Sequence, residues 1–178
     1  MKFPRRRPLT YSVEFEQWVP SPIEQVFLFF ANPNNLPRIM PPALGAKLVH
    51  VELKAPPAHG LARNIPLAGA GTAIIVSVRV LPFLPLRAPW VARIVEFEWN
   101  HHFVDIQEKG PFKSWRHRHQ FAAGVRNGVA GTLVSDAVEY EIGFGPLGAV
   151  AQKLLVSHQL QETFAHRQKI LESLLAEK

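Results

Sequence analysis

Two histidines and an aspartate stand at strand spacing on either side of one predicted hairpin turn. His117 and His119 are two positions apart, so both imidazoles point to the same face of an extended strand. Asp136 follows after Asn127 and Gly128, the dipeptide that most strongly favours a two-residue type I′ turn. Imidazole and carboxylate groups on one face can orient a ligand, move a proton or hold a metal ion.

A two-residue loop at this turn determines the partners across the hairpin, because positions are counted outward from it. The predicted pairs are Trp115 with Tyr140, His117 with Val138, His119 with Asp136, and Phe121 with Val134. The opposite face then carries Arg116, Arg118, Gln120, Glu139 and Glu141, which belong in water. We therefore expect the aromatic and imidazole face to point toward a helix. A bulge at Gly124 or Gly131 would change which residues pair across the hairpin. It would have less effect on which face of the sheet each side chain points to.

The preceding strand offers two choices of inward face. Either Phe103, Asp105 and Gln107 point inward, or Val104 and Ile106 do. The aromatic anchor favours the first choice. Asp105 would then join the histidines, and a buried carboxylate is costly unless it is paired or hydrogen-bonded.

The residues alone leave three interpretations of the inward face open. In the first, His119 and Asp136 are a satisfied polar pair that braces the interior. In the second, they form, together with His117, the polar end of an apolar pocket and orient a ligand carbonyl or hydroxyl. In the third, Asp136 supports His119 as a general base near neutral pH.

Metal binding is the weaker interpretation of the histidines. Zinc on His117 and His119 would need one of the two nearby aspartates as a third ligand, since no third histidine stands at a fixed spacing. His101 and His102 fall in a predicted turn, and adjacent side chains on an extended chain diverge. We therefore predict no metal site and expect His101 and His102 to lie in solvent.

The glycines Gly143, Gly145 and Gly148 match the G-x-G-x-x-G pattern of dinucleotide-binding loops. Such a unit needs a second parallel strand and an acidic residue about 20 positions further on. Here the helical pattern runs to the end of the sequence and Gln168 stands at that place. Pro146 also removes a backbone N–H where a phosphate would need donors. We predict no nucleotide cofactor, and no other cofactor.

The remaining sequence predicts the elements that hold this face in place. Ser21, Pro22 and Glu24 form a dense helix-start signal, with Ser21 as the cap. Three prolines interrupt residues 81–89, so this segment cannot be a central strand. From residue 146 to about 176 the pattern is helical, with one broad apolar stripe. Strands are predicted at residues 11–19, 46–54, 72–80, 91–99, 103–109, 113–121 and 132–141. The prediction is an α+β fold with an antiparallel sheet and one long closing helix.

Composition and charge exclude several classes of function. A chain of 178 residues with 47% hydrophobic content predicts a single domain over residues 1–178, and the absence of cysteine excludes disulfides and thiolate metal sites. Of the net charge of +6, residues 1–9 carry +4, which leaves 6 − 4 = +2 for the rest. We interpret residues 1–9 as a flexible basic tail, predict no nucleic-acid partner, and expect at most a weak attraction to a membrane surface. Without a signal peptide or an apolar span, a cytoplasmic location is expected.

A set of short motifs extends over nearly the whole chain, at residues 21–27, 32–42, 103–112, 115–121, 136–140, 145–148 and 159–164. In these motifs and in the order of its elements, the chain resembles the SRPBCC superfamily of START-like lipid-transport and polyketide cyclase/dehydrase proteins, in particular its small bacterial ligand-binding members. The resemblance implies a helix-grip fold, in which a seven-stranded curved antiparallel sheet wraps a long C-terminal helix and two short helices follow the first strand. It also implies a hydrophobic cavity between sheet and helix, and it supplies no catalytic residues.

We predict a protein that binds or carries a small hydrophobic or amphipathic ligand and needs no catalysis. The alternative is a cyclase- or dehydratase-like enzyme in which His119 and Asp136 transfer a proton on a polyketide-like substrate. A second alternative is an interaction or membrane-surface module that uses the N-terminal arginines and residues 81–89. The sequence determines neither the ligand nor the oligomeric state. The predicted ligand contacts are Phe103, Asp105, Gln107, Trp115, His117, His119, Phe121, Asp136, Tyr140, Leu154 and His158.

Overall fold

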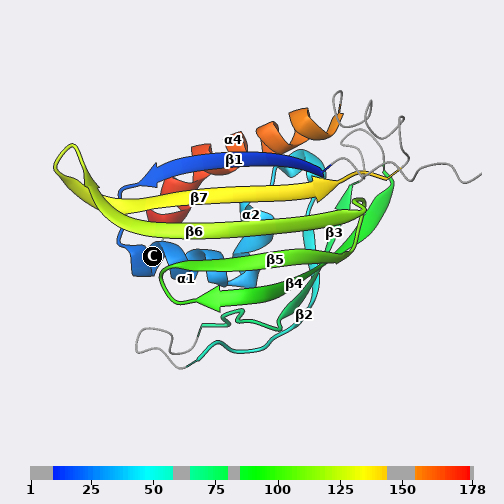
Figure 1. Cartoon of the computed structure of the whole chain (residues 1–178), viewed down its shortest axis with the longest axis horizontal. Helices are drawn as coiled ribbons and strands as arrows, with labels where there is room; N and C mark the ends of the chain where they lie inside the picture. The colour runs from blue at the N-terminus through cyan, green and yellow to red at the C-terminus, as the bar shows by residue number, and fades with distance from the viewer. Residues whose placement is uncertain (1–9, 58–64, 80–84, 144–154, 177–178) are drawn as a thin grey trace, which may run out of the picture.

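The computed structural model describes residues 10–57, 65–79, 85–143 and 155–176, which form a curved sheet with helices on one face (Figure 1). The predicted basic tail, part of the proline-rich segment and the predicted start of the final helix lie outside the described residues. In chain order the elements are β1 (Thr10–Val19), α1 (Ile23–Ala31), the 3-10 turn η1 (Pro33–Asn35), α2 (Leu36–Ile39), the 3-10 turn η2 (Pro42–Leu44), β2 (Lys47–Glu52), β3 (Ala73–Arg79), β4 (Arg87–Glu98), β5 (His102–Lys109), β6 (Ser114–Arg126), β7 (Val129–Glu141) and α4 (Ser157–Ala176).

The seven strands form one antiparallel sheet in the order β1-β7-β6-β5-β4-β3-β2. Helices α1 and α4 lie on the same face of this sheet, and α4 runs along β1 (Figure 1). Helix α1 buries Val26, Phe27, Phe29 and Ala31 against the core, as its apolar sequence requires. This is the α+β helix-grip architecture that the sequence predicts. No helix among the described residues is both long and apolar enough to cross a membrane.

The β6–β7 hairpin has the predicted register. Asn127 and Gly128 have φ angles of 53° and 77°, the left-handed pair that a type I′ turn requires. No bulge interrupts the pairing, and Gly124 lies directly opposite Gly131. A Cβ atom on Gly131 would lie 2.6 Å from the ring of Trp18, so glycine at this position lets the indole pack against the hairpin. Both strands therefore continue beyond their predicted ends, as far as the turn.

Strand β4 begins earlier than the prolines predict. Pro89 lies inside it, opposite Ser77 of β3, in a segment that was expected not to be a central strand. The pairing of β4 with β5 starts only at Val91 and Lys109. The missing N–H of Pro89 therefore falls where β4 pairs on one side only, which is the situation of an edge strand. Pro89 thus lies inside a strand but outside its doubly paired part, which agrees with the expectation that this segment is not a central strand.

The predicted cap of the first helix is wrong. Helix α1 has Pro22 as its N-cap residue, with no side-chain cap hydrogen bond. Ser21 is held by the sheet instead, because its N–H donates to the carbonyl of Val19 at 2.8 Å and its carbonyl accepts from Thr132 Oγ1 at 2.8 Å. These two bonds fix the start of α1 against β1 and β7.

Candidate functional site

A buried charged cluster lies between the sheet and α4, where a core is usually apolar. It consists of Asp105 from β5, His117 and His119 from β6, Asp136 from β7 and Arg167 from α4. The exposed fraction is 9% for each histidine, 1% for Asp136 and 5% for Arg167. Residues on three adjacent strands and one helix thus bring two carboxylates, two imidazoles and a guanidinium together.

Asp136 and Arg167 form the centre of this cluster. The guanidinium is bidentate, with Nη1 3.1 Å from Oδ1 and Nη2 in closer contact with Oδ2. Its Cζ atom lies 4.6 Å from the ring centre of Phe164 and 5.3 Å from that of Phe30. Burial by itself would raise the pKa of Asp136. The guanidinium and the contacts with both histidines outweigh it and hold that pKa well below its usual range.

The two histidines share the same two carboxylates but carry protons differently. His117 Nε2 lies 2.9 Å from Asp136 Oδ1, and His119 Nε2 lies 3.3 Å from Asp105 Oδ2. His119 Nδ1 is also 2.9 Å from Asp136 Oδ1, in a direction that gives an ionic contact and no well-aligned hydrogen bond. The imidazole rings are 3.8 Å apart between centres. Such short separations couple their protonation.

Burial lowers the pKa of His117, and the positive charge on His119 lowers it further, beyond what the bond to Asp136 restores. Burial alone would also lower the pKa of His119, but its contacts with Asp105 and Asp136 outweigh that effect, so this pKa is raised. The two directions favour the charged imidazolium for His119 and the neutral imidazole for His117. In that state the positive charges of Arg167 and His119 balance the two carboxylates.

Aromatic clusters flank the charged cluster on both sides. At one end, Trp115 packs edge-on against Trp90 with ring centres 5.0 Å apart, and Phe112 and Tyr140 complete the group. At the other end, Phe103 stacks on His119 with ring centres 4.3 Å apart. The arrangement is an apolar interior with a polar middle, bounded by flat rings.

The structure brings most of the predicted contacts onto one inward face. They are Phe103, Asp105, Trp115, His117, His119, Phe121, Asp136 and Tyr140, with the cross-strand pairs expected from the turn. The inward face of β5 is the expected one, since Phe103 and Asp105 contact the histidines. Val104 is fully buried as well, between Glu96 and Arg118 on the neighbouring strands.

Two predicted contacts are not part of this cluster, and a third lies outside the described residues. Gln107 is used by the following turn, because its amide donates to the carbonyl of Phe112 at 2.7 Å and accepts from the N–H of the same residue at 3.3 Å. The side chain of His158 is 71% exposed and lies 3.6 Å from Glu162, one helical turn further on. His158 stands on the outer side of α4, so its predicted place in the cavity is wrong. Leu154 lies outside the described residues.

Sequence reasoning missed Arg167, the only cation that pairs with Asp136 among the described residues apart from the histidines. The signal was present in the final helix. Leu160, Phe164, Arg167, Leu171 and Leu175 are its buried residues, and they follow helical spacing. A lone arginine on an apolar stripe, opposite a predicted buried aspartate, indicates a buried ion pair.

Asp105, His117 and His119 are close enough to be considered as metal ligands, but one of their separations is wider than a zinc ion requires. Asp105 Oδ2 and His117 Nδ1 are 3.8 Å apart, whereas two ligands of a tetrahedral zinc ion with bonds of about 2.05 Å are about 3.3 Å apart. An ion would also compete with the contacts that His119 makes with Asp105 and Asp136. The donor set is better described as a site for protons and hydrogen bonds.

Similar structures share this architecture. A protein from Thermus thermophilus, TTHA0849, is 19% identical with a TM-score of 0.65, over 94% of this chain and 100% of its own. Norcoclaurine synthase from Thalictrum flavum, in complex with dopamine and hydroxybenzaldehyde, is 13% identical with a TM-score of 0.58, over 100% and 97%. The di-domain ARO/CYC protein BexL of the BE-7585A biosynthetic pathway is 16% identical with a TM-score of 0.64, over 96% of this chain and 51% of its own.

At these identities the likeness extends to the fold only. A comparison with curated protein sequences gives no significant match. The family model described as polyketide cyclase / dehydrase and lipid transport, however, matches residues 19–168, which is most of the chain. The chain therefore belongs to the polyketide cyclase/dehydrase and lipid-transport family, within the SRPBCC superfamily.

Proposed function

We propose that this protein binds a small hydrophobic or amphipathic molecule between the sheet and α4, with the polar group of the ligand at the buried charged cluster. The observation that carries the proposal is an unused donor. Arg167 Nε is buried and has no hydrogen-bond acceptor among the described residues, although the other two nitrogens of the guanidinium are paired with Asp136. A buried charged donor without an acceptor costs free energy, and a ligand carbonyl or hydroxyl would remove that cost.

The aromatic cluster next to the charges supports a ring-bearing or chain-bearing ligand. Trp90 and Phe112 are only partly buried, and both rings lie about 5 Å from the buried ring of Trp115. Flat apolar surfaces of this kind supply contact area, while a few polar groups fix orientation. Small aromatic molecules bound to norcoclaurine synthase, which has the same fold, are consistent with such a ligand.

Binding can be tested with two probes that differ only in a polar group, naphthalene and 2-naphthoic acid, titrated against tryptophan fluorescence. Arg167→Lys keeps the charge but replaces the three guanidinium nitrogens with one ammonium nitrogen, so the donor at Nε is lost. We expect this variant to bind naphthoate about tenfold more weakly, the effect of one charge-assisted hydrogen bond. Its affinity for naphthalene should be unchanged. Native mass spectrometry of the protein purified without extraction should also reveal a bound small molecule.

The matched control is Val95→Ala, an exposed apolar residue on β4. It should bind both probes like the original protein, whereas Trp90→Ala should weaken both. If neither probe binds and no mass co-purifies, or if Arg167→Lys weakens naphthalene as much as naphthoate, the proposal is wrong.

A second candidate function is proton transfer in a cyclase or dehydratase. The observation that favours it is the opposite direction of the two histidine pKa shifts beside the same carboxylates. Neutral His117 could take a proton from a carbon next to a carbonyl. The electron pair would then form the new double bond as the C–O bond breaks, and His119 would give its proton to the departing hydroxide, which leaves as water.

His119→Asn separates the two functions. An enzyme should lose turnover by a far larger factor than it loses substrate affinity, because proton transfer acts in the transition state. A binding protein should retain measurable affinity for naphthoate. Single-turnover rates and probe affinities measured on the same variant decide between them.

A further inference from the structure

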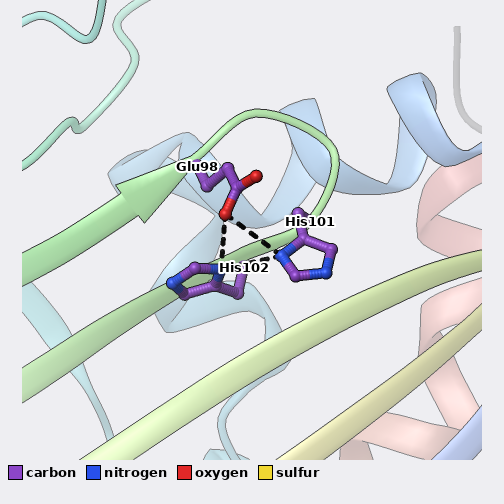
Figure 2. Close-up of side chains that lie close together, drawn as sticks. All are labelled: Glu98, His101 and His102. Atoms are coloured by element: carbon purple, nitrogen blue, oxygen red, sulfur yellow. Dashed lines mark hydrogen bonds and ion pairs between the residues drawn. The ribbon is translucent and has the colours of Figure 1, made fainter.

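The turn between β4 and β5 holds a second group of imidazoles and a carboxylate, at the surface. Glu98 ends β4, and His102 begins β5. Figure 2 shows the side chains of Glu98, His101 and His102 converging on one point. We propose that this group binds a divalent transition-metal ion through Glu98 Oε2 and the Nδ1 atoms of both histidines.

The backbone of the turn explains why the two histidines converge, contrary to the sequence-based expectation that they diverge. Asn100 has a φ of 54°, in the left-handed region. The N–H of His101 donates to the carbonyl of Glu98 at 3.2 Å and closes the turn. His101 is therefore not part of an extended strand, and the alternation of side chains does not apply to it.

The distances between the three atoms match the edges of a metal coordination sphere. The two Nδ1 atoms are 3.0 Å apart. Glu98 Oε2 lies 3.2 Å from Nδ1 of His101 and 3.4 Å from Nδ1 of His102. For bonds of about 2.05 Å, ligand atoms are about 3.3 Å apart in a tetrahedron and about 2.9 Å apart in an octahedron. One ion can thus contact all three atoms with little movement of the side chains.

Hydrogen bonds satisfy the lone pairs of these three atoms less well than a metal ion does. A proton between two of the three atoms makes one hydrogen bond, and two Nδ1–H groups facing each other at 3.0 Å would repel. An ion shared by three lone pairs satisfies them together. This contrasts with the charged cluster in the core, where Arg167 already pairs with a carboxylate.

A second carboxylate orients one of the proposed ligands. Glu96 Oε2 lies 3.4 Å from Nε2 of His102, on the far side of the ring from Nδ1. Glu96 is itself fixed by Arg116 at 2.7 Å and Arg118 at 3.3 Å. A carboxylate behind Nε2 keeps the proton there and leaves the lone pair of Nδ1 free, which is the usual support of a metal-bound histidine.

The donor set selects the class of ion. Two imidazole nitrogens and one carboxylate suit Zn²⁺, Ni²⁺ or Cu²⁺, whereas Mg²⁺ and Ca²⁺ require mainly oxygen ligands. The side chains of Glu98 and His101 are 63% and 56% exposed, so the remaining coordination positions face solvent. A cleft of about 370 Å³, lined in part by Asn100, His101 and Gln120, lies beside them. A metal-bound water or a small anion has access from that side.

Calorimetric titration of the untagged full chain with ZnCl₂ and NiCl₂ tests the site. We expect one ion per chain at the turn. His101→Gln and Glu98→Gln each remove an exposed ligand and should weaken binding by more than a hundredfold. Glu96→Gln removes only the support behind His102 and should weaken it by about 10- to 100-fold. The chain has no cysteine, so thiolates do not compete.

Two controls decide where an observed ion binds. His158→Gln removes an exposed histidine that has a carboxylate 3.6 Å away on α4, and it should leave the affinity unchanged. His117→Gln should also leave it unchanged. Loss of binding in His117→Gln but not in His101→Gln would place the ion in the core and overturn the proposal. No binding by the unaltered chain at millimolar ZnCl₂ would overturn it too.

Discussion

Asp105, His117 and His119 in the core and Glu98, His101 and His102 at the β4–β5 turn each combine one carboxylate with two imidazoles. The core carboxylate and imidazoles lie between the sheet and α4, with side-chain exposures of 18%, 11% and 11%. At the turn, Glu98 and His101 are more than half exposed. The first group is surrounded by two further charged residues and aromatic rings. In the second, only the His102 side chain is similarly buried, at 13%, with the Glu96 carboxylate beside it.

This difference decides which chemistry each group can perform. In the core, every charge must be balanced, so Asp136 and Arg167 accompany the histidines and the cluster holds protons in fixed places. At the turn, no such balance is required, and lone pairs can remain free for an ion. The residue types alone therefore do not distinguish the chemistry of the two groups. Their burial and the neighbouring charges do.

The largest expected effect comes from breaking the ion pair in the core. Arg167→Met leaves Asp136 buried without its main counter-charge, so we expect the free energy of unfolding to fall by about 3–5 kcal/mol. Urea denaturation monitored by tryptophan fluorescence measures this loss. Asp136→Asn should be similarly costly, because it leaves a buried guanidinium unpaired.

The double variant distinguishes a true pair from two independent packing losses. In Asp136→Asn/Arg167→Met, neither charge is left alone, so the loss should be smaller than the sum of the single losses by about 1–3 kcal/mol. Strictly additive losses would mean that the two side chains do not depend on each other, and the comparison with the turn would lose its basis.

The pH dependence of stability is the next effect in size. His119 has a raised pKa in the folded state, so its contribution is fully present below its ordinary value of 6.5 and is lost as the pH rises through the folded pKa. His117 has a lowered pKa, so its contribution is present above 6.5 and is lost as the pH falls through the folded pKa. Together they predict maximum stability near pH 6.5, measured as the urea midpoint from pH 5 to pH 8.5.

Single substitutions separate the two limbs of this profile. His119→Gln should flatten the alkaline limb, and His117→Gln should flatten the acid limb. The contribution of Asp136 is present above its ordinary pKa of 3.8 and is lost only in stronger acid, since its pKa is lowered well below that value. A profile that both variants leave unchanged would contradict the protonation states assigned to the core.

The sequence predicts the faces of the core cluster well, for a local reason. Asn127 and Gly128 specify a two-residue turn, and strand alternation then determines the partners of His119 and Trp115 without any knowledge of the rest of the chain. The strands along the chain and the closing helix follow from similar short-range patterns, whereas the pairing of β1 with β7 joins the two ends of the sequence. The register of this hairpin thus depends on information that lies close together in the sequence, and the helix-grip architecture was expected from the resemblance.

The Arg167–Asp136 pair, the convergence of the turn histidines and the accommodation of Pro89 depend on contacts that no local sequence pattern specifies. Arg167 reaches Asp136 across 31 positions of sequence, and only the packing of α4 on the sheet brings them together. His101 and His102 converge because a non-glycine residue, Asn100, adopts a positive φ, which strand alternation does not anticipate. Pro89 is accommodated because β5 starts to pair with β4 only beyond it.

The smallest expected effect is the stability change at the turn, and its smallness is informative. Without added metal, Glu98→Gln and His101→Gln should each change the free energy of unfolding by no more than about 0.5 kcal/mol, because exposed polar substitutions rarely do more. With saturating ZnCl₂, the unaltered chain should gain stability, since an ion that binds only the folded state shifts the equilibrium toward it, and the two variants should not. Urea curves with and without zinc measure both effects. A loss above about 1 kcal/mol in metal-free protein would mean that these side chains already stabilise the turn. The turn group and the core group would then both have a structural role and would differ only in how deeply they are buried.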